Sequence, residues 1–134
     1  KVKYAKCCLP IPGDDIIGYI TFSNGVTIHR RDCKNLQNLD IGSRSINVKW
    51  KQMVKANFEA VIKVKANNRD LVIADVLKKM KDMKIDVNGI NSRVTPDREI
   101  IIELVVAVPN TEILLKVLKE IKKIDSVFET KRIQ

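Results

Sequence analysis

The sequence has few aromatic residues, few chain-breaking residues and no long apolar run. Its 134 residues include one Trp, two Tyr, three Phe, five Gly and four Pro. No segment approaches the ~18 consecutive apolar residues that a membrane-spanning helix needs, so we expect no membrane association. With 45% hydrophobic and 31% charged residues, the chain is not a disordered tail either. Its length allows one ordinary domain or two small ones, too little for a large multidomain enzyme.

The usual signatures of catalysis are also missing from the sequence. It contains no Gly-rich phosphate loop, no paired-carboxylate cluster and no dinucleotide fingerprint. Cysteine is scarce, and Cys7, Cys8 and Cys33 all lie in the first quarter of the chain. An odd number of cysteines does not form a closed set of disulfides, and no charged-then-apolar leader opens the chain. We therefore expect a reducing, cytoplasmic environment.

Acidic residues are few in the first part of the chain, which makes its charge uneven. The whole chain carries a formal net charge of +9. Residues 1–56 hold ten Lys or Arg and four Asp, a net charge of +6, and residues 57–134 have a net charge of +3. A basic surface attracts phosphate backbones, but it can also be a solvated face that keeps the protein soluble. The charge alone does not distinguish a nucleic-acid-binding surface from a solvated one, because no base-stacking stripe of aromatic residues is visible.

Residues 1–55 predict a small β-rich module with a short helix. Pro10, Pro12 and Gly13 indicate a rigid turn. The other expected elements are a strand over 16–22, a hairpin turn at Ser23-Asn24-Gly25, a strand over 26–29, a short helix capped by Asp32 and running to Leu39, and a closing strand with Ile46, Val48 and Trp50. Large apolar residues are few, so this module needs a staple such as a metal ion.

Residues 56–134 predict the order β-α-β-β-α-β, which together with the first module makes the fold class α+β. Two helices would cover one side of a four-stranded antiparallel, ferredoxin-like sheet. The expected elements are a strand over 58–64, a helix capped at Asn67-Asn68 with an apolar stripe of Ile73, Val76, Leu77 and Met80, a strand over 85–94, a turn over 95–98, a strand over 100–108, a helix capped by Asn110 with an apolar face of Ile113, Leu114, Val117, Leu118 and Ile121, and a strand over 127–133.

The strand expected over residues 100–108 is apolar on both faces. Its even-numbered residues can face the helices, but Ile101, Val105 and Ala107 on the opposite side are apolar as well. A sheet face left in water should be polar. We therefore expect that a second copy of the chain or another domain covers this face.

Chemistry-bearing residues gather in one set, namely Cys7, Cys8, His29 and Cys33. Together they could form a Cys₃His tetrahedral zinc site, with His29 and Cys33 four residues apart on one helical face. Neighbouring residues on an extended strand point to opposite faces, so Cys7 and Cys8 can share one ion only if the backbone turns there. Buried, inert cysteines with a surface His remain an alternative. So does a cysteine nucleophile with His29 as base, although no third orienting group is apparent.

A family resemblance rests on an ordered run of residues. The run Cys7-Cys8-Leu9-Pro10-Ile11-Pro12-Gly13-Asp14, with Gly18-Tyr19, Gly25-Val26, His29, Cys33 and Arg44-x-Ile46-x-Val48-x-Trp50 after it, resembles the conserved-cysteine module of long RelA/SpoT-type (p)ppGpp synthetase/hydrolases. In that family an ACT domain follows the module, and residues 56–134 resemble one. The resemblance implies a regulatory fragment without catalytic residues, which controls the catalytic domains of a GTP pyrophosphokinase parent during amino-acid starvation.

The same resemblance implies the partners and the metal ligands. The cysteine module would dock on the ribosome and contact ribosomal RNA, and the ACT domain would help to sense deacylated tRNA. The zinc ligands would be Cys7, Cys8, His29 and Cys33. From charge and position we expect RNA contacts at Arg30, Arg31, Lys34 and Arg44. A homodimer through the ACT sheet would cover the apolar face of strand 100–108.

One loop departs from the family pattern. The ACT ligand loop usually reads Asp-Arg-x-Gly-Leu-Leu, whereas this chain has Asn68-Arg69-Asp70-Leu71-Val72-Ile73. Residues Asn68, Arg69, Asp70 and Leu71 are therefore the candidate ligand-binding residues. They would serve the alternative function, an amino-acid-sensing dimer that binds a branched-chain amino acid. Leu71 at the glycine position would crowd such a ligand.

Overall fold

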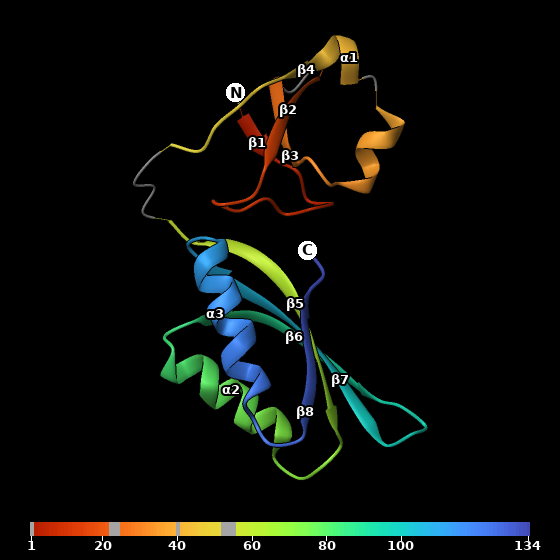
Figure 1. The fold of residues 1–134 in the computed structure, drawn as a ribbon, viewed down its shortest axis with the longest axis vertical. Helices are drawn as coiled ribbons and strands as arrows, with labels where there is room; N and C mark the ends of the chain where they lie inside the picture. The colour runs from red at the N-terminus through yellow and green to blue at the C-terminus, as the bar shows by residue number, and fades with distance from the viewer. Residues whose placement is uncertain (1, 22–24, 40, 52–55) are drawn as a thin grey trace.

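A computed structural model describes residues 2–21, 25–39, 41–51 and 56–134. The chain forms two sheets, one above the other in Figure 1. The first sheet has the strand order β1-β3-β2-β4. Its elements are β1 (Val2–Tyr4), β2 (Ile16–Thr21), β3 (Gly25–Arg30), a 3-10 helix η1 (Lys34–Asn38), α1 (Ile41–Arg44) and β4 (Ser45–Ile46). β1 pairs parallel with β3, and the other pairs are antiparallel.

The first module differs from the sequence expectation at its ends. β2 and β3 pair up to Thr21 and Gly25, while Phe22, Ser23 and Asn24, on which the predicted strand end and hairpin turn fall, lie outside the described residues. The cap predicted at Asp32 is wrong, because Cys33 precedes η1 and makes no side-chain cap hydrogen bond. The closing strand is only β4, and the prediction that Val48 and Trp50 belong to it is wrong. β1 and α1 were not predicted.

The second sheet confirms the predicted β-α-β-β-α-β order. Its strands lie in the order β6-β7-β5-β8, and all pairs are antiparallel. Both helices lie on one side of this sheet (Figure 1). The elements are β5 (Phe58–Asn67), α2 (Val72–Asp82), β6 (Asp86–Val94), β7 (Glu99–Val108), α3 (Thr111–Lys122) and β8 (Val127–Arg132).

The core of the second module follows the predicted alternation along the central strands. On β5 and β7 every second residue is buried against the helices, including Ile62, Val64, Ile102 and Leu104. The cap of α3 is confirmed, since the side chain of Asn110 accepts a hydrogen bond from the N–H of Ile113 at 2.9 Å. The turn over residues 95–98 is present too, closed by the hydrogen bond from the N–H of Arg98 to Thr95 O.

The start of α2 was predicted wrongly. β5 continues through Asn67, and the residue before α2 is Leu71, in the left-handed conformation with φ 68°. The predicted apolar stripe is confirmed at Val76 and Met80, which are buried, and Ile73 packs half-buried against the core. The stripe also includes Val72, which was not predicted, while the predicted Leu77 is 37% exposed. The start of α2 differs because β5 pairs with β7 as far as Asn67 and Glu99, and strand pairing outweighs the capping preference of asparagine.

The loop over residues 9–14 of the first module packs against the second module. Ile11, although it belongs to the first module, is completely buried in the core of the second. Asp14 forms a bidentate ion pair with Arg132 on β8, with N···O distances of 2.8 and 2.9 Å. The N–H of Thr111, at the start of α3, donates to Pro12 O at 2.9 Å. Gly13 lies against Thr111 with φ 102°, and an added Cβ would come 2.0 Å from the Thr111 hydroxyl.

None of the helices among the described residues has the length and apolar character that crossing a membrane requires.

Candidate functional site

The four predicted metal ligands lie together in the first module. Their ligand atoms are all within 4.8 Å of one another. Cys7 Sγ is 3.6 Å from His29 Nδ1 and 3.5 Å from Cys33 Sγ, and Cys8 Sγ is 3.8 Å from His29 Nδ1. A tetrahedral zinc ion with bonds of about 2.3 Å to sulfur and about 2.0 Å to nitrogen separates its ligand atoms by about 3.5–3.8 Å. The three distances given match this spacing, so the four residues could hold one metal ion of this kind.

A backbone turn lets the adjacent cysteines share one site. The chain leaves β1 in a turn in which the N–H of Leu9 donates to Ala5 O at 3.1 Å, and Leu9 has φ 46°. Because residues 6–8 are in this turn and not in an extended strand, the Cys7 and Cys8 side chains reach the same ligand cluster. The turn that the adjacent pair requires is thus present.

The other two ligands are brought together differently from the expectation. His29 lies on β3, and Cys33 follows a tight turn closed by the hydrogen bond from its N–H to Arg30 O at 3.0 Å. The prediction that His29 and Cys33 share a helical face is therefore wrong. The turn after β3 brings the two side chains together instead.

Burial and hydrogen bonds shift the pKa values of these ligand groups in different directions, which affects how easily each group can bind a metal ion. Burial raises the pKa of the Cys8 thiol to about 12 and lowers the pKa of His29, which keeps the imidazole neutral. Burial alone would raise the pKa of the Cys33 thiol, but hydrogen bonds, first from the backbone of Asn35, outweigh it and the pKa falls. A neutral imidazole and a thiol whose pKa is lowered suit a cation, whereas Cys8 has to release a proton at a raised pKa.

The cluster opens onto a cavity that the second module helps to form. The cavity has a volume of about 430 Å³. Its lining includes Cys7, Cys33 and Lys34 on one side and the chain's last two residues on the other. The side chain of Gln134 donates a hydrogen bond to Cys7 O at 3.2 Å. The end of the chain therefore touches the backbone of a candidate ligand.

Two of the four predicted RNA contacts interact with groups of the protein itself. Arg30 pairs with Asp32 at 3.1 Å, and the Arg44 guanidinium donates to Ile20 O at 2.7 Å and lies 5.7 Å from the centre of the Tyr19 ring. Arg31 and Lys34 are exposed. RNA binding by these four residues stays a prediction.

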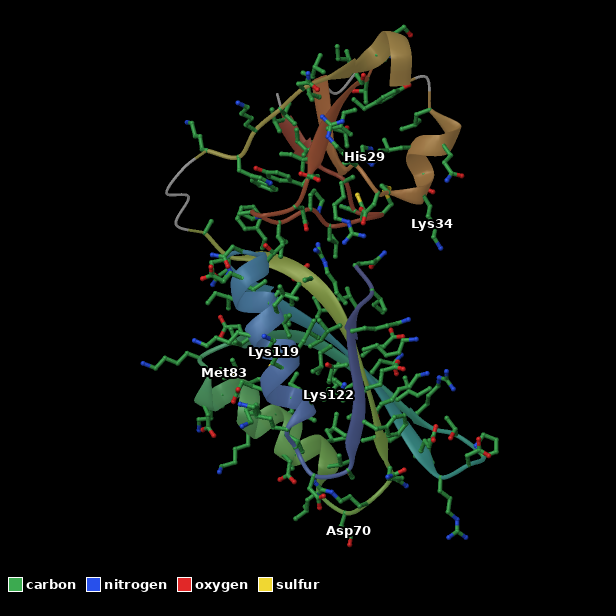
Figure 2. All side chains as sticks on the ribbon, viewed as in Figure 1. His29, Lys34, Asp70, Met83, Lys119 and Lys122 are labelled. Atoms are coloured by element: carbon green, nitrogen blue, oxygen red, sulfur yellow. The ribbon has the colours of Figure 1, made fainter. Side chains whose placement is uncertain are left out.

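The predicted amino-acid loop lies far from the cluster. Figure 2 shows His29 in the first module and Asp70 at the opposite end of the second. Arg69 folds back within its own module and donates to Asp125 O at 2.8 Å and to Asp75 at 2.9 Å. Leu71 is 72% exposed. The Asn68–Leu71 loop therefore keeps its arginine occupied by protein groups, and ligand binding there stays a prediction.

Sequence reasoning missed the residues that connect the cluster to the second module. The sequence predicts a turn around Ile11 and Asp14 and a strand that contains Arg132, but no contact between them. A signal was present for Ile11, because an apolar residue between two prolines is a poor choice for a solvated turn. No comparable signal marks Arg132, whose partner Asp14 is remote in the sequence.

Two family models match the chain, one for each module. Residues 1–51 match the RelA/SpoT RIS domain, and residues 55–132 match the ACT domain. The chain therefore belongs to the ACT domain family and carries a RelA/SpoT RIS domain ahead of the ACT domain. This pair of domains matches the C-terminal regulatory region of RelA/SpoT-type GTP pyrophosphokinases, not the catalytic domains.

Individual relatives support the same assignment. The chain is 34% identical over 132 residues to a GTP pyrophosphokinase of Haemophilus influenzae and 30% identical over 132 residues to the bifunctional (p)ppGpp synthase/hydrolase RelA of Mycobacterium tuberculosis. These alignments cover 96% and 98% of this chain but only 18% of each relative. A solved ACT domain from a GTP pyrophosphokinase of Chlorobium tepidum has a TM-score of 0.51 at 18% identity, covering 57% of this chain and 99% of that one. That likeness shows the fold alone.

Proposed function

We propose that this chain regulates a cytoplasmic stringent-response enzyme that makes or degrades (p)ppGpp. In this proposal the RIS domain docks on ribosomal RNA close to a deacylated tRNA, and the two domains pass that state to catalytic domains of the same parent chain. The observation that carries the proposal is the match of residues 1–51 to a RelA/SpoT RIS domain. The net charge of +6 over residues 1–56 supports an RNA partner.

We propose that the RIS domain holds a structural zinc ion at Cys7, Cys8, His29 and Cys33. The apolar cluster of the RIS domain is small, with Ala5, Cys8, Ile17, Cys33 and Leu36 as its buried members. A core of that size gives little stability by itself. Two of its five members are candidate ligands, so a bound ion would stabilise the same small core.

The exposed cations next to the cluster give the docking proposal a direct test. Arg31 and Lys34 lie in the RIS domain, and Lys119 and Lys122 on α3 of the ACT domain offer a matched pair of the same charge. The test is co-sedimentation of the chain with ribosomes over a range of salt concentrations. We expect steep salt dependence, and we expect Arg31→Gln with Lys34→Gln to weaken binding and lower the salt slope by about 1 per lost phosphate contact. Lys119→Gln with Lys122→Gln should leave both unchanged.

Two results would overturn the docking proposal. One is a chain that fails to sediment with ribosomes even at low salt. The other is an equal loss in both charge-matched pairs, since this would indicate unspecific attraction between a basic protein and RNA.

The outer face of the ACT sheet supports a homodimer. Val61 on β5 and Ile101, Val105 and Ala107 on β7 project away from the helices and are half-buried in the single chain. Val61 is directly opposite Val105 in the strand register, and Ala107 follows Val105 on the same face, so these three side chains form an apolar strip; Glu103, opposite Lys63, separates this strip from Ile101. We propose that a second copy covers it, since such a strip on a sheet loses contact with water on association.

A further inference from the structure

The structure gathers three aromatic rings that lie far apart in a sequence poor in them. Tyr4 on β1 and Trp50 stack with their ring centres 5.6 Å apart and their planes 10° from parallel. Phe58, at the start of β5, meets both rings edge-on at 5.8 and 5.6 Å. The indole N–H of Trp50 donates to Asp14 O at 3.1 Å. The stack is therefore held in place from several sides.

Tyr4 belongs to an apolar face of the RIS sheet that is open to solvent. Strand register puts the side chains of Val2, Tyr4, Ile20 and Ile46 on the same side of this sheet. They are 59%, 48%, 40% and 38% exposed, and they are the large apolar side chains that the described part of the RIS domain leaves exposed. We call these four residues and Trp50 the aromatic face. Concentrated exposure of this kind marks an interaction surface.

The aromatic face borders a cavity whose lining residues carry a net positive charge. The cavity has a volume of about 240 Å³, and its lining consists of Val2, Tyr4, Ile16, Ile28, Val48, Lys49, Trp50 and Lys51. Two of these residues are lysines and none is acidic. Within the described residues neither Lys49 nor Lys51 takes part in an ion pair. An apolar cavity with an exposed aromatic ring at its wall and two lysines at its border suits a ligand that is both planar and anionic.

We propose that the aromatic face binds an unstacked base of single-stranded or looped RNA. The base lies against the exposed Tyr4 ring, and Lys49 and Lys51 neutralise the neighbouring phosphates. Aromatic rings bordered by cations are the usual platform for single-stranded nucleic acid, because every base has a flat face to stack. The inference rests on the proposed docking to ribosomal RNA and identifies the contact that reads looped RNA there.

The first experiment uses Trp50 as a probe, since it is the only tryptophan of the chain. The chain is titrated with a ten-nucleotide oligoadenylate and, in parallel, with a ten-nucleotide abasic strand that keeps the phosphates. We expect the oligoadenylate to quench the fluorescence and the abasic strand to bind more weakly with little quenching. Equal binding of the two strands would overturn the proposal, because the phosphates alone would then account for the affinity.

The second experiment compares the loss of an aromatic ring at Tyr4 with the loss of an aromatic ring elsewhere on the surface. Tyr4→Leu should weaken oligoadenylate binding roughly 5- to 150-fold, the range for loss of one base–aromatic stack, while Tyr4→Phe keeps the ring and should bind like the original. The matched control is Phe128→Leu, since Phe128 is a 42% exposed aromatic residue on β8 of the ACT domain. Circular dichroism checks that each variant is folded. If Tyr4→Leu does not fold, Lys49→Gln with Lys51→Gln takes its place and should weaken binding and reduce the salt slope.

Ribosome co-sedimentation separates this inference from the proposed function. If the chain binds ribosomes but the oligoadenylate does not change Trp50 fluorescence and Tyr4→Leu does not change ribosome binding, the inference is wrong and the docking proposal stands. If Tyr4→Leu prevents ribosome binding while no RNA strand binds the face, the partner is a protein and the inference is also wrong. If the oligoadenylate binds through Tyr4 but ribosomes do not, the docking proposal fails and the RNA face stands.

Discussion

The ion pair between Asp14 and Arg132 offers the most direct test of how the two domains depend on each other. The Arg132 guanidinium donates to both carboxylate oxygens of Asp14, at 2.8 and 2.9 Å, and to Leu9 O at 3.0 Å. The two side chains are only 16% and 10% exposed. Arg132→Met keeps most of the aliphatic length and removes the charge. Asp14 then remains as a mostly buried carboxylate that still accepts a hydrogen bond from the N–H of Ile11, at 2.8 Å.

The expected loss follows from that burial. Removing one partner of a buried ion pair destabilises a protein by about 3–5 kcal/mol, because the other charge is left uncompensated. Water still reaches part of both groups here, so we expect the lower end of this range, about 3 kcal/mol of unfolding free energy. The matched control is Lys131→Met, the same kind of change at the exposed neighbouring position on β8, which should alter stability by less than about 0.5 kcal/mol.

Urea unfolding with two probes is the assay. Trp50 fluorescence reports on the RIS domain, and far-UV circular dichroism reports mainly on helices α2 and α3 of the ACT domain. In the original protein the two transitions should coincide, because Ile11 is completely buried in the ACT core and ties the domains into one cooperative unit. In Arg132→Met they should move to lower urea and separate. A loss below about 1 kcal/mol, or separate transitions before any substitution, would refute this reasoning.

Three further predictions concern Leu71, the cysteine cluster and the outer ACT face. Leu71→Gly should raise the free energy of unfolding by about 0.5–1 kcal/mol, measured by thermal or urea unfolding. The reason is that Leu71 has φ 68°, a conformation that only glycine adopts without cost. The control Leu71→Ala keeps a Cβ and should change the free energy of unfolding little. Zinc affinity, measured by chelator competition, should fall at least about tenfold per pH unit as the pH drops from 8 to 6, since the Cys8 thiol, whose pKa burial raises to about 12, must lose its proton; a pH-independent affinity would contradict this site. Val105→Lys should turn a dimer into a monomer in sedimentation velocity, because it puts a charge into the apolar strip next to Val61; Lys63→Met on the same face is the control and should not dissociate it.

The ACT domain was the more predictable half because its burial pattern is periodic. Alternation on β5 and β7 and the apolar spacing on α3 each follow directly from which side faces the core. The one wrong element start was α2, where Asn68 looked like a cap. Neither local propensity nor spacing reveals that β5 continues to Asn67, since that depends on pairing with a distant strand.

The RIS domain was less predictable because it is held together by few residues. β1 has only three residues, all exposed, and pairs with a strand more than twenty positions away. No periodic signal arises from such a short element. The residue types of the candidate metal cluster could be read from the sequence, but not the turn over residues 6–8 that brings Cys7 and Cys8 together. The contact of Tyr4 and Trp50 on the aromatic face could not be predicted either, because the two residues are far apart in the sequence and meet only in the folded chain.

The close approach of Gly13 to Thr111 has a consequence for how this sequence can vary among its relatives. Position 13 has both a left-handed backbone and a threonine hydroxyl where its Cβ would be. Only residues that tolerate positive φ, such as asparagine or aspartate, could replace the glycine, and then only alongside a smaller residue at position 111. These two positions, one in each domain, should therefore covary, and a hybrid that joins a RIS domain from one species to an ACT domain from another should fail wherever the pair is mismatched.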